Sequence, residues 1–122
     1  MRIGELSRRT GIPSHRLRYY DDHGLLPGRR TPNGYRDFAP EAELRAAQVA
    51  RLVGMGLTME DVQVVLPCTY GPEVEVRLCE SQRRQVAERL ALVQQRLAGL
   101  ERSAGALQEV LARDDADAAA TH

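Results

Sequence analysis

Apolar residues recur at helical spacing in two short segments near the start of the chain. The pattern predicts a helix over residues 4–9, a turn at Thr10-Gly11-Ile12, and a second helix that begins at Pro13. Proline is tolerated there because the first turn of a helix leaves its N–H groups unpaired. Gly24 follows the second helix and is expected to adopt the left-handed conformation that ends helices.

The second predicted helix carries side chains that suit DNA. His15, Arg16, Arg18 and Tyr19 cluster in adjacent turns, whereas Leu17 points the other way. Arginine on a short helix can bind guanine edges or phosphates in the major groove. A solvated basic face would produce the same pattern, so this helix alone leaves both interpretations open.

A β-hairpin is predicted between Arg29 and Phe38. Asn33-Gly34 is the strongest short-range hairpin signal when it lies between potential strands, and arginines flank it on both sides. A helix-turn-helix followed by a basic hairpin is a winged helix-turn-helix, in which the hairpin contacts the DNA backbone beside the groove.

Two further helices are expected after the hairpin. The first covers residues 40–53 and ends at Gly54-Met55-Gly56. Thr58 caps the second, which carries Val62 and ends at Pro67. Residues 68–72 are expected to form a loop.

The longest predicted helix begins at Cys79 and carries apolar residues at alternating spacings of four and three. This heptad pattern is typical of a coiled coil, and a single helix cannot bury such a stripe. A coiled coil between two protomers is therefore favoured over packing within one chain. The seam consists of Val86, Leu90, Val93, Leu97, Leu100, Ala104, Leu107 and Leu111.

The length of 122 residues fits one small domain with an appended helix. The predicted division is a DNA-binding domain over 1–72, a dimerisation helix over 73–112 and a flexible, polar, Ala-rich tail over 113–122. The expected fold class is therefore mainly α, with a winged helix-turn-helix followed by a long C-terminal helix.

The charges are unevenly distributed, although the net charge is zero. Residues 1–38 hold eight arginines and four acidic residues, whereas the remainder holds nine arginines and thirteen acidic residues. This asymmetry favours an N-terminal module that binds a polyanion. No segment reaches the roughly 18 apolar residues of a membrane span, and no export signal is recognised. We therefore expect a cytoplasmic protein whose two cysteines are reduced at rest.

These elements in this order resemble the MerR family of bacterial transcription regulators. The resemblance rests on RIGELSRRTGIPSHRLRYYDDHGLL at 2–26, NGYRDF at 33–38, GMGLTMEDV at 54–62 and the heptad helix at 79–112, so it covers essentially the whole chain. It implies a homodimer whose long helices pair antiparallel and place two winged modules on palindromic promoter DNA. It also implies that the dimer bends and untwists the promoter until RNA polymerase engages both of its elements, which is indirect readout.

The resemblance also assigns DNA contacts to individual residues. The recognition-helix roles fall on His15, Arg16, Arg18 and Tyr19, with Tyr20 towards the DNA backbone and a core position as its alternative. The wing roles fall on Arg30, Tyr35 and Arg36.

The signal that such a regulator senses is less well defined. Cys79 lies where the metal-sensing branch of the family has a ligand, but residues 112–122 contain no cysteine and only His122 there could bind a metal. A metal ion is therefore conceivable, but its third ligand is not identified. A thiol switch requires only Cys68 and Cys79, since the dipole at a helix N-terminus lowers a thiol pKa and a turn near Gly71 could join the two. Inert packing of both thiols, or a different hydrophobic effector, stays open.

Three function classes follow from these observations. The leading hypothesis is a dimeric promoter-specific regulator with a thiol or metal input. A DNA-architectural protein without an effector is the second, and the heptad helix argues against it because a dimer fixes half-site spacing. An enzyme is disfavoured, since no catalytic Ser/His/Asp or Cys/His constellation and no phosphate loop are recognised.

Overall fold

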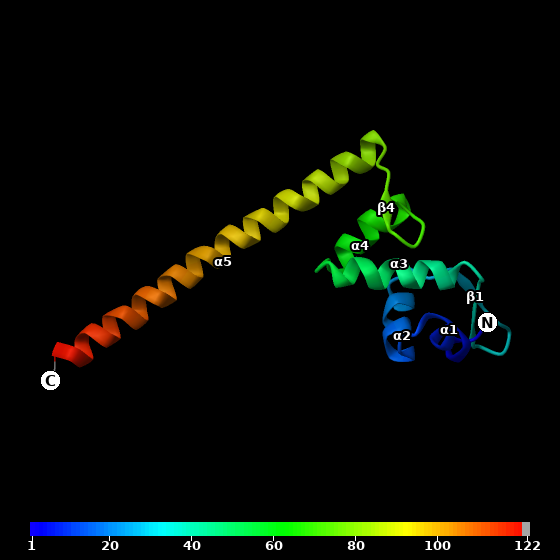
Figure 1. The fold of residues 1–122 in the computed structure, drawn as a ribbon, viewed down its shortest axis with the longest axis horizontal. Helices are drawn as coiled ribbons and strands as arrows, with labels where there is room; N and C mark the ends of the chain where they lie inside the picture. The colour runs from blue at the N-terminus through cyan, green and yellow to red at the C-terminus, as the bar shows by residue number, and fades with distance from the viewer. Residues whose placement is uncertain (121–122) are drawn as a thin grey trace. The chain divides into compact units, whose positions relative to one another are not determined.

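The computed structural model describes residues 1–120 and consists mainly of helices (Figure 1). Met1–Arg83 forms one compact unit, and a second unit begins at Arg84. The expected fold class, mainly α with a winged helix-turn-helix and a long C-terminal helix, is confirmed. In chain order the elements are α1 (Ile3–Thr10), α2 (Ser14–Asp22), β1 (Gly28–Arg30), β2 (Arg36–Phe38), α3 (Ala42–Gly54), α4 (Met59–Val65), the 3-10 turn η1 (Leu66–Cys68), β3 (Thr69–Tyr70), β4 (Glu75–Val76) and α5 (Glu80–Ala120).

The helix-turn-helix is formed by α1 and α2, and two glycines end these helices. Gly11 has φ 73° and donates its N–H to Ser7 O at 2.8 Å, while Gly24 has φ 71° and donates to Asp21 O at 2.8 Å. Positive φ is readily adopted only by glycine, which explains why the chain can reverse at these positions. The predicted turn and the predicted role of Gly24 are both confirmed.

The wing is the antiparallel pair of β1 and β2, in which Gly28 lies opposite Phe38 and Arg30 opposite Arg36. Its connection is longer than a two-residue turn, because Thr31 N–H donates to Tyr35 O and Gly34 N–H donates to Thr31 O, both at 2.9 Å. Pro32 has no N–H to give to a ladder and fits a turn position instead. The hairpin is therefore confirmed, with a wider tip than Asn33-Gly34 alone indicates.

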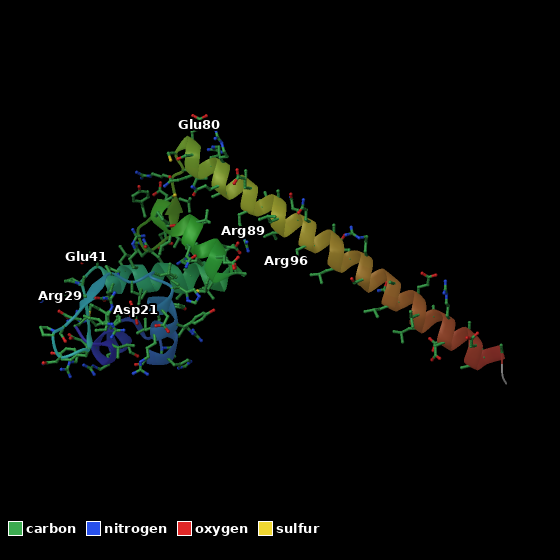
Figure 2. The ribbon with its side chains drawn as sticks, turned by 180° about the vertical axis from the view of Figure 1, so that it is seen from behind. Asp21, Arg29, Glu41, Glu80, Arg89 and Arg96 are labelled. Atoms are coloured by element: carbon green, nitrogen blue, oxygen red, sulfur yellow. The ribbon has the colours of Figure 1, made fainter. Side chains whose placement is uncertain are left out.

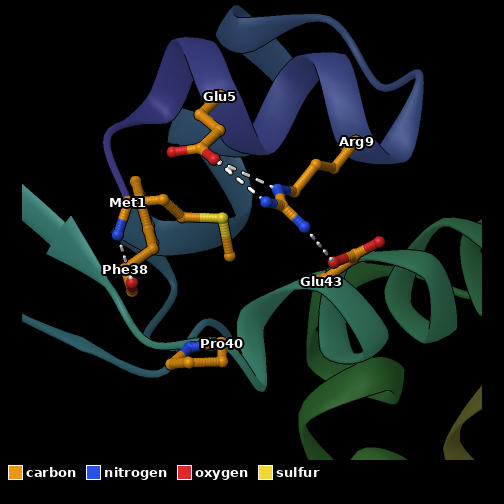
Figure 3. Close-up of a pocket in the computed structure, with 6 residues that line it drawn as sticks. All are labelled: Met1, Glu5, Arg9, Phe38, Pro40 and Glu43. Atoms are coloured by element: carbon orange, nitrogen blue, oxygen red, sulfur yellow. Dashed lines mark hydrogen bonds and ion pairs between the residues drawn. The ribbon is translucent and has the colours of Figure 1, made fainter.

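The core of the first unit lies between α1, α2, α3, α4 and β2. Leu6, Leu17, Val49 and Val62 are completely buried in it. At its edge, Arg9 on α1 pairs with Glu5 at 3.1 Å and with Glu43 on α3 at 3.7 Å (Figure 3).

Helix α4 begins with the predicted cap. Asp61 N–H donates to the Thr58 hydroxyl at 3.2 Å, and Thr58 N–H donates back to the Asp61 carboxylate at 2.9 Å. This reciprocal capping box satisfies two N–H groups that a helix start leaves unpaired.

A second hairpin follows η1 where a loop was expected. β3 and β4 pair antiparallel, with Thr69 opposite Val76 and Tyr70 opposite Glu75. Val74 is buried in the core at φ 50°, a conformation that β-branched residues rarely adopt. Burial of its side chain against the core accompanies this unusual backbone.

Helix α5 begins directly after Cys79, as predicted. Cys79 N–H donates to Gln82 Oε1 at 3.1 Å, and Arg83 N–H donates to Cys79 O at 2.9 Å, so Cys79 occupies the position that caps the helix. The helix continues to Ala120 and thus includes most of the stretch expected as a flexible tail. His122, the candidate metal ligand of that stretch, lies outside the described residues.

Candidate nucleic-acid interface

Helix α2 has one buried and one exposed side. Leu17 is completely buried, whereas His15, Arg16, Arg18 and Tyr19 are exposed. These four residues are those predicted for a recognition helix, and the structure leaves all of them accessible to a ligand.

Tyr20 lies on the buried side instead. Its side chain is only 2% exposed and belongs to the core. Burial raises the pKa of its hydroxyl, and the neighbouring Arg16 guanidinium opposes that rise. Burial thus supports the core position that was the alternative for Tyr20, because a residue three positions after Leu17 lies on the same side of a helix, and its contact with the DNA backbone stays a prediction.

The end of α2 is fixed by contacts of Tyr19 and His23. Their rings meet edge to face with centroids 4.6 Å apart, and His23 Nδ1 lies 2.8 Å from Tyr19 O. Gln63 on α4 donates to His23 O at 3.2 Å, which ties the end of α2 to α4. Tyr19 nevertheless keeps about half of its surface exposed, so its ring remains available.

Arg36 joins the wing to α2. Its Nε lies 3.2 Å from both carboxylate oxygens of Asp21, and its Nη2 donates to Leu26 O at 3.1 Å. The Arg36 and Asp21 side chains are only 26% and 18% exposed. A guanidinium that binds a carboxylate and a carbonyl directs most of its donors into the protein. In the structure Arg36 acts as a clamp that positions the wing, and its predicted DNA contact stays a prediction. Figure 2 labels Asp21 on α2 and Arg29 on the wing.

The tip of the wing presents Arg30 and Tyr35. Arg30 Nη1 donates to Gly34 O at 3.2 Å, which holds its side chain against the loop. The guanidinium carbon of Arg2 lies 3.8 Å from the centroid of the Tyr35 ring, a cation–π contact. Sequence reasoning missed Arg2, because its contact with Tyr35 joins residues far apart in the chain and leaves no periodic signal.

The arginines of residues 1–38 fall into two groups. Arg9, Arg29 and Arg36 form ion pairs with carboxylates. The others have no carboxylate partner within the described residues, and an unpaired guanidinium keeps its charge available to a phosphate. This second group consists of Arg2, Arg8, Arg16, Arg18 and Arg30.

A hollow of about 340 Å³ lies between α2 and the wing. Three unpaired arginines line it, one from the segment before α1, one from α2 and one from β1. The full lining consists of Arg2, Ile3, Arg18, Asp21, Asp22, Arg30, Tyr35, Arg36 and Phe38.

The two thiols occupy different environments. Cys68 is 1% exposed, and burial raises the pKa of its thiol, with a further contribution from nearby Cys79. Cys79 is exposed, and its Sγ lies 3.2 Å from the Ser81 hydroxyl, a contact that lowers the Cys79 pKa. The Cys79 thiol is therefore expected to form its thiolate at lower pH than the Cys68 thiol.

The second hairpin brings both cysteines to its open end. Arg77 N–H donates to Cys68 O at 2.9 Å, which extends the register beyond Thr69 and Val76. Cys79 follows two residues after Arg77, and both thiols are free. The turn thus joins the two segments that carry the cysteines, and the thiol switch between them stays a prediction.

The same hairpin is bonded to α3. The side chain of Gln48, which is buried, donates to Gly71 O at 3.1 Å, and its carbonyl accepts from Arg45 at 3.1 Å. Arg45 also donates to Leu66 O at 2.9 Å. Gln48 and Arg45 therefore couple the backbone around Cys68 to the DNA-binding module.

Within residues 1–120 of one chain, no three His, Cys, Asp or Glu side chains are grouped closely enough to hold a metal ion. A four-ligand zinc site therefore does not fit a single chain over this range.

The described helices also include none long and apolar enough to cross a membrane.

The chain matches the family described as MerR HTH family regulatory protein over residues 1–68. It is 41% identical over 66 residues to the HTH-type transcriptional regulator HmrR of Rhizobium leguminosarum bv. viciae, covering 54% of this chain and 51% of HmrR. It is 31% identical over 77 residues to the mercuric resistance operon regulatory protein of Bacillus cereus, covering 62% of this chain and 58% of that protein. The match thus spans little more than half the length of these relatives.

A solved structure has a similar fold. The transcription regulator PbrR691 from Ralstonia metallidurans CH34, crystallised in complex with lead(II), superimposes with a TM-score of 0.61 at 22% identity, covering 89% of this chain and 83% of PbrR691. Because the family match covers more than half of the chain, and the helix-turn-helix and wing agree with it, this chain belongs to the MerR family of transcription regulators.

Proposed function

We propose that this protein is a transcription regulator that binds double-stranded promoter DNA as a homodimer. The observation that carries the proposal is the set of arginines without carboxylate partners on α2, on the wing and before α1. His15, Arg16, Arg18 and Tyr19 would contact base edges and phosphates, while Arg30 and Tyr35 contact the backbone beside the groove.

Helix α5 supports the homodimer. None of its described residues is buried in the single chain, and its seam leucines are more than half exposed. A leucine stripe at heptad spacing is stable in water only when another helix covers it. An antiparallel pair of α5 helices would place two winged modules on a palindromic site, from which the dimer distorts the DNA for RNA polymerase.

The proposed signal is oxidation of the two thiols. The Cys79 thiolate attacks a hydroperoxide, so that a sulfenic acid forms on Cys79 and hydroxide or an alkoxide leaves. The Cys68 sulfur then attacks the Cys79 sulfur, the S–O bond breaks, and a disulfide and water form. The hydroperoxide is reduced and two thiols are oxidised. Since Cys68 is buried, the hairpin must loosen during this step, and Gln48 and Arg45 transmit the change to α3.

A metal-responsive function is the second candidate, and the relatives favour it. One of them regulates a mercuric resistance operon. In this chain Cys79 is an exposed thiol that a soft metal ion would bind. The remaining ligands would include one from the second protomer, since a single chain does not group enough of them within residues 1–120.

Two experiments test these proposals. A footprint on the DNA upstream of the protein's own coding region tests promoter binding, and protection of a palindrome is expected. Thiol titration and metal analysis of anaerobically purified protein test the signal. Two free thiols without metal, followed by loss of both after mild peroxide treatment, support the switch. Stoichiometric bound metal that disappears in Cys79→Ser contradicts the switch and supports the metal sensor.

A further inference from the structure

The hollow between α2 and the wing is lined by arginines from three separate parts of the chain. Arg2 precedes α1, Arg18 lies on α2 and Arg30 lies on β1. None of the three has a carboxylate partner in the described part of the chain. Because like charges repel, such a convergence is unfavourable unless an anion shares the space. The arrangement therefore points to an anionic ligand.

Two carboxylates also line this hollow, but its net charge remains positive. Asp21 is bound by Arg36 through contacts of 3.1–3.2 Å, so its charge is already compensated. Asp22 is exposed at the rim. Four guanidinium groups against two carboxylates leave an excess of positive charge that suits a single phosphate group.

Tyr35 holds Arg2 beside the hollow. The 3.8 Å cation–π contact restricts a long side chain that would otherwise sample many rotamers. A guanidinium already fixed in place loses less conformational entropy when it binds a ligand. The stack therefore preorganises Arg2 for an anion in the hollow.

The wing itself supplies a built-in comparison. Side chains alternate between the two faces of a strand, so adjacent Arg29 and Arg30 point to opposite sides of β1. Arg30 lines the hollow with Arg2 and Arg18, whereas Arg29 lines another surface with Met1 and Pro40. Two arginines on one short strand thus differ in whether they face the proposed anion.

We propose that this hollow seats one backbone phosphate of the bound DNA, with Arg2 as a direct ligand beside Arg18 and Arg30, and with Tyr35 positioning Arg2. The inference rests on the proposed DNA-binding function and extends it, because the segment before α1 becomes a third contacting element besides α2 and the wing.

The first test is the salt dependence of binding to a labelled duplex that contains the footprinted site. Each lost phosphate contact lowers the slope of log K against log salt by about 0.9. Arg2→Ala is expected to lower the slope by about that amount and to weaken binding on the order of fivefold at moderate salt. The control Arg29→Ala removes one arginine charge from the wing, on the face that does not line the hollow, and is expected to keep the wild-type slope. Urea unfolding of both variants checks that the module is folded.

The second test addresses the positioning role of Tyr35. Tyr35→Ala is expected to weaken binding, and adding Arg2→Ala to it is expected to cost little more, since the freed arginine is already less effective. Tyr35→Phe, which keeps the ring, is expected to bind more tightly than Tyr35→Ala. Additive losses in the double variant would contradict the positioning role.

The third test locates the phosphate. Neutral methylphosphonate linkages are placed one at a time along the duplex, and binding is measured for the wild type and for Arg2→Ala. One linkage is expected to weaken the wild type and to leave Arg2→Ala unaffected. If the wild type shows no salt-dependent DNA binding, the proposed function fails and the phosphate seat with it. A different result overturns only the phosphate seat: the wild type binds DNA, Arg18→Ala weakens that binding, but Arg2→Ala behaves like Arg29→Ala.

Discussion

Arg18 and Arg36 both line the hollow between α2 and the wing, but their guanidinium groups differ in what they contact. Arg18 has no carboxylate partner within residues 1–120, whereas Arg36 is bound by Asp21 and Leu26 O. One side chain is therefore available to DNA, and the other holds two elements together. Substitution of each is expected to change a different property.

Arg18→Ala is expected to weaken operator binding by about 1–3 kcal/mol while leaving the stability of the module unchanged. The reason is that the side chain is exposed and its loss removes only a ligand contact. Anisotropy titrations with the specific duplex and with a scrambled duplex measure the effect and any loss of base preference. Unchanged affinity for both duplexes would remove α2 from the interface.

Arg36→Ala is expected to lower the free energy of unfolding of the first unit by about 1–3 kcal/mol, because the Asp21 carboxylate and Leu26 O lose a charged donor in a partly buried site. Urea denaturation measures this change. Arg29→Ala is the control, since its ion pair with Asp37 is long at 3.8 Å and exposed, and little change is expected there. Full stability of Arg36→Ala with lost DNA affinity would identify Arg36 as a phosphate ligand after all.

The two cysteines are expected to alkylate with different pH profiles. The Ser81 hydroxyl lowers the Cys79 pKa, whereas burial raises the Cys68 pKa, so the Cys79 thiolate forms at lower pH. Iodoacetamide labelling of the native protein, followed by mass spectrometry, is expected to modify Cys79 first and with the lower midpoint. Ser81→Ala should shift that midpoint upward. Faster labelling of Cys68 would contradict the assignment of Cys79 as the attacking thiol.

For single residues, helical spacing in the sequence predicted well which side chains are exposed and which are buried. Tyr20 lies three positions after Leu17 and shares its buried side, whereas the resemblance pointed to DNA and left a core position as the alternative. The clamp between Arg36 and Asp21 joins residues 15 positions apart, and no periodicity predicts it. The stack of Arg2 on Tyr35 is equally non-local, which is why Arg2 was missed.

Among the elements, the hairpin of β3 and β4 depends on a buried amide of α3. Gln48 joins Arg45 to Gly71 O, so its loss leaves a partly buried carbonyl without this donor. Gln48→Ala is expected to destabilise the first unit by about 1–3 kcal/mol. In Gln48→Ala, amide hydrogen exchange is expected to be faster in residues 69–77 than in α1. Equal stability of Gln48→Ala and wild type would mean that the hairpin is held by its apolar contacts alone.

The elements that the sequence predicted best are those with a local signal. Gly24 and the Thr58 cap act through neighbouring backbone groups, and both lie where their chemistry requires. The second hairpin has strands of only two residues, too short to show an alternation of apolar and polar positions. Val74 at φ 50° also breaks the usual preference of β-branched residues, so only tertiary packing explains it.

For the whole molecule, the central question is what covers the apolar stripe of α5. Leu97 lies in the middle of the seam and is 55% exposed in the single chain. Leu97→Glu is expected to yield monomers, because a charge at an apolar seam position is strongly unfavourable in a coiled coil. Sedimentation velocity measures the change, and Gln95→Glu, which adds the same charge on the helix face opposite the seam, is the control. A dimer in Leu97→Glu would place the interface elsewhere.

The direction of helix pairing determines which disulfides can form. Helix α5 has 41 residues and is therefore roughly 60 Å long at about 1.5 Å per residue. In an antiparallel pair the two Cys79 residues lie near opposite ends of the coiled coil, whereas a disulfide requires Cα atoms within about 7 Å. In a parallel pair they would lie side by side. Mild oxidation is therefore expected to give an intrachain bond between Cys68 and Cys79, or a mixed disulfide on exposed Cys79, and no covalent dimer. Non-reducing electrophoresis of the wild type and Cys79→Ser tests this expectation. A dimer band that requires Cys79 would overturn the antiparallel arrangement, and two thiols that stay free under peroxide would overturn the switch.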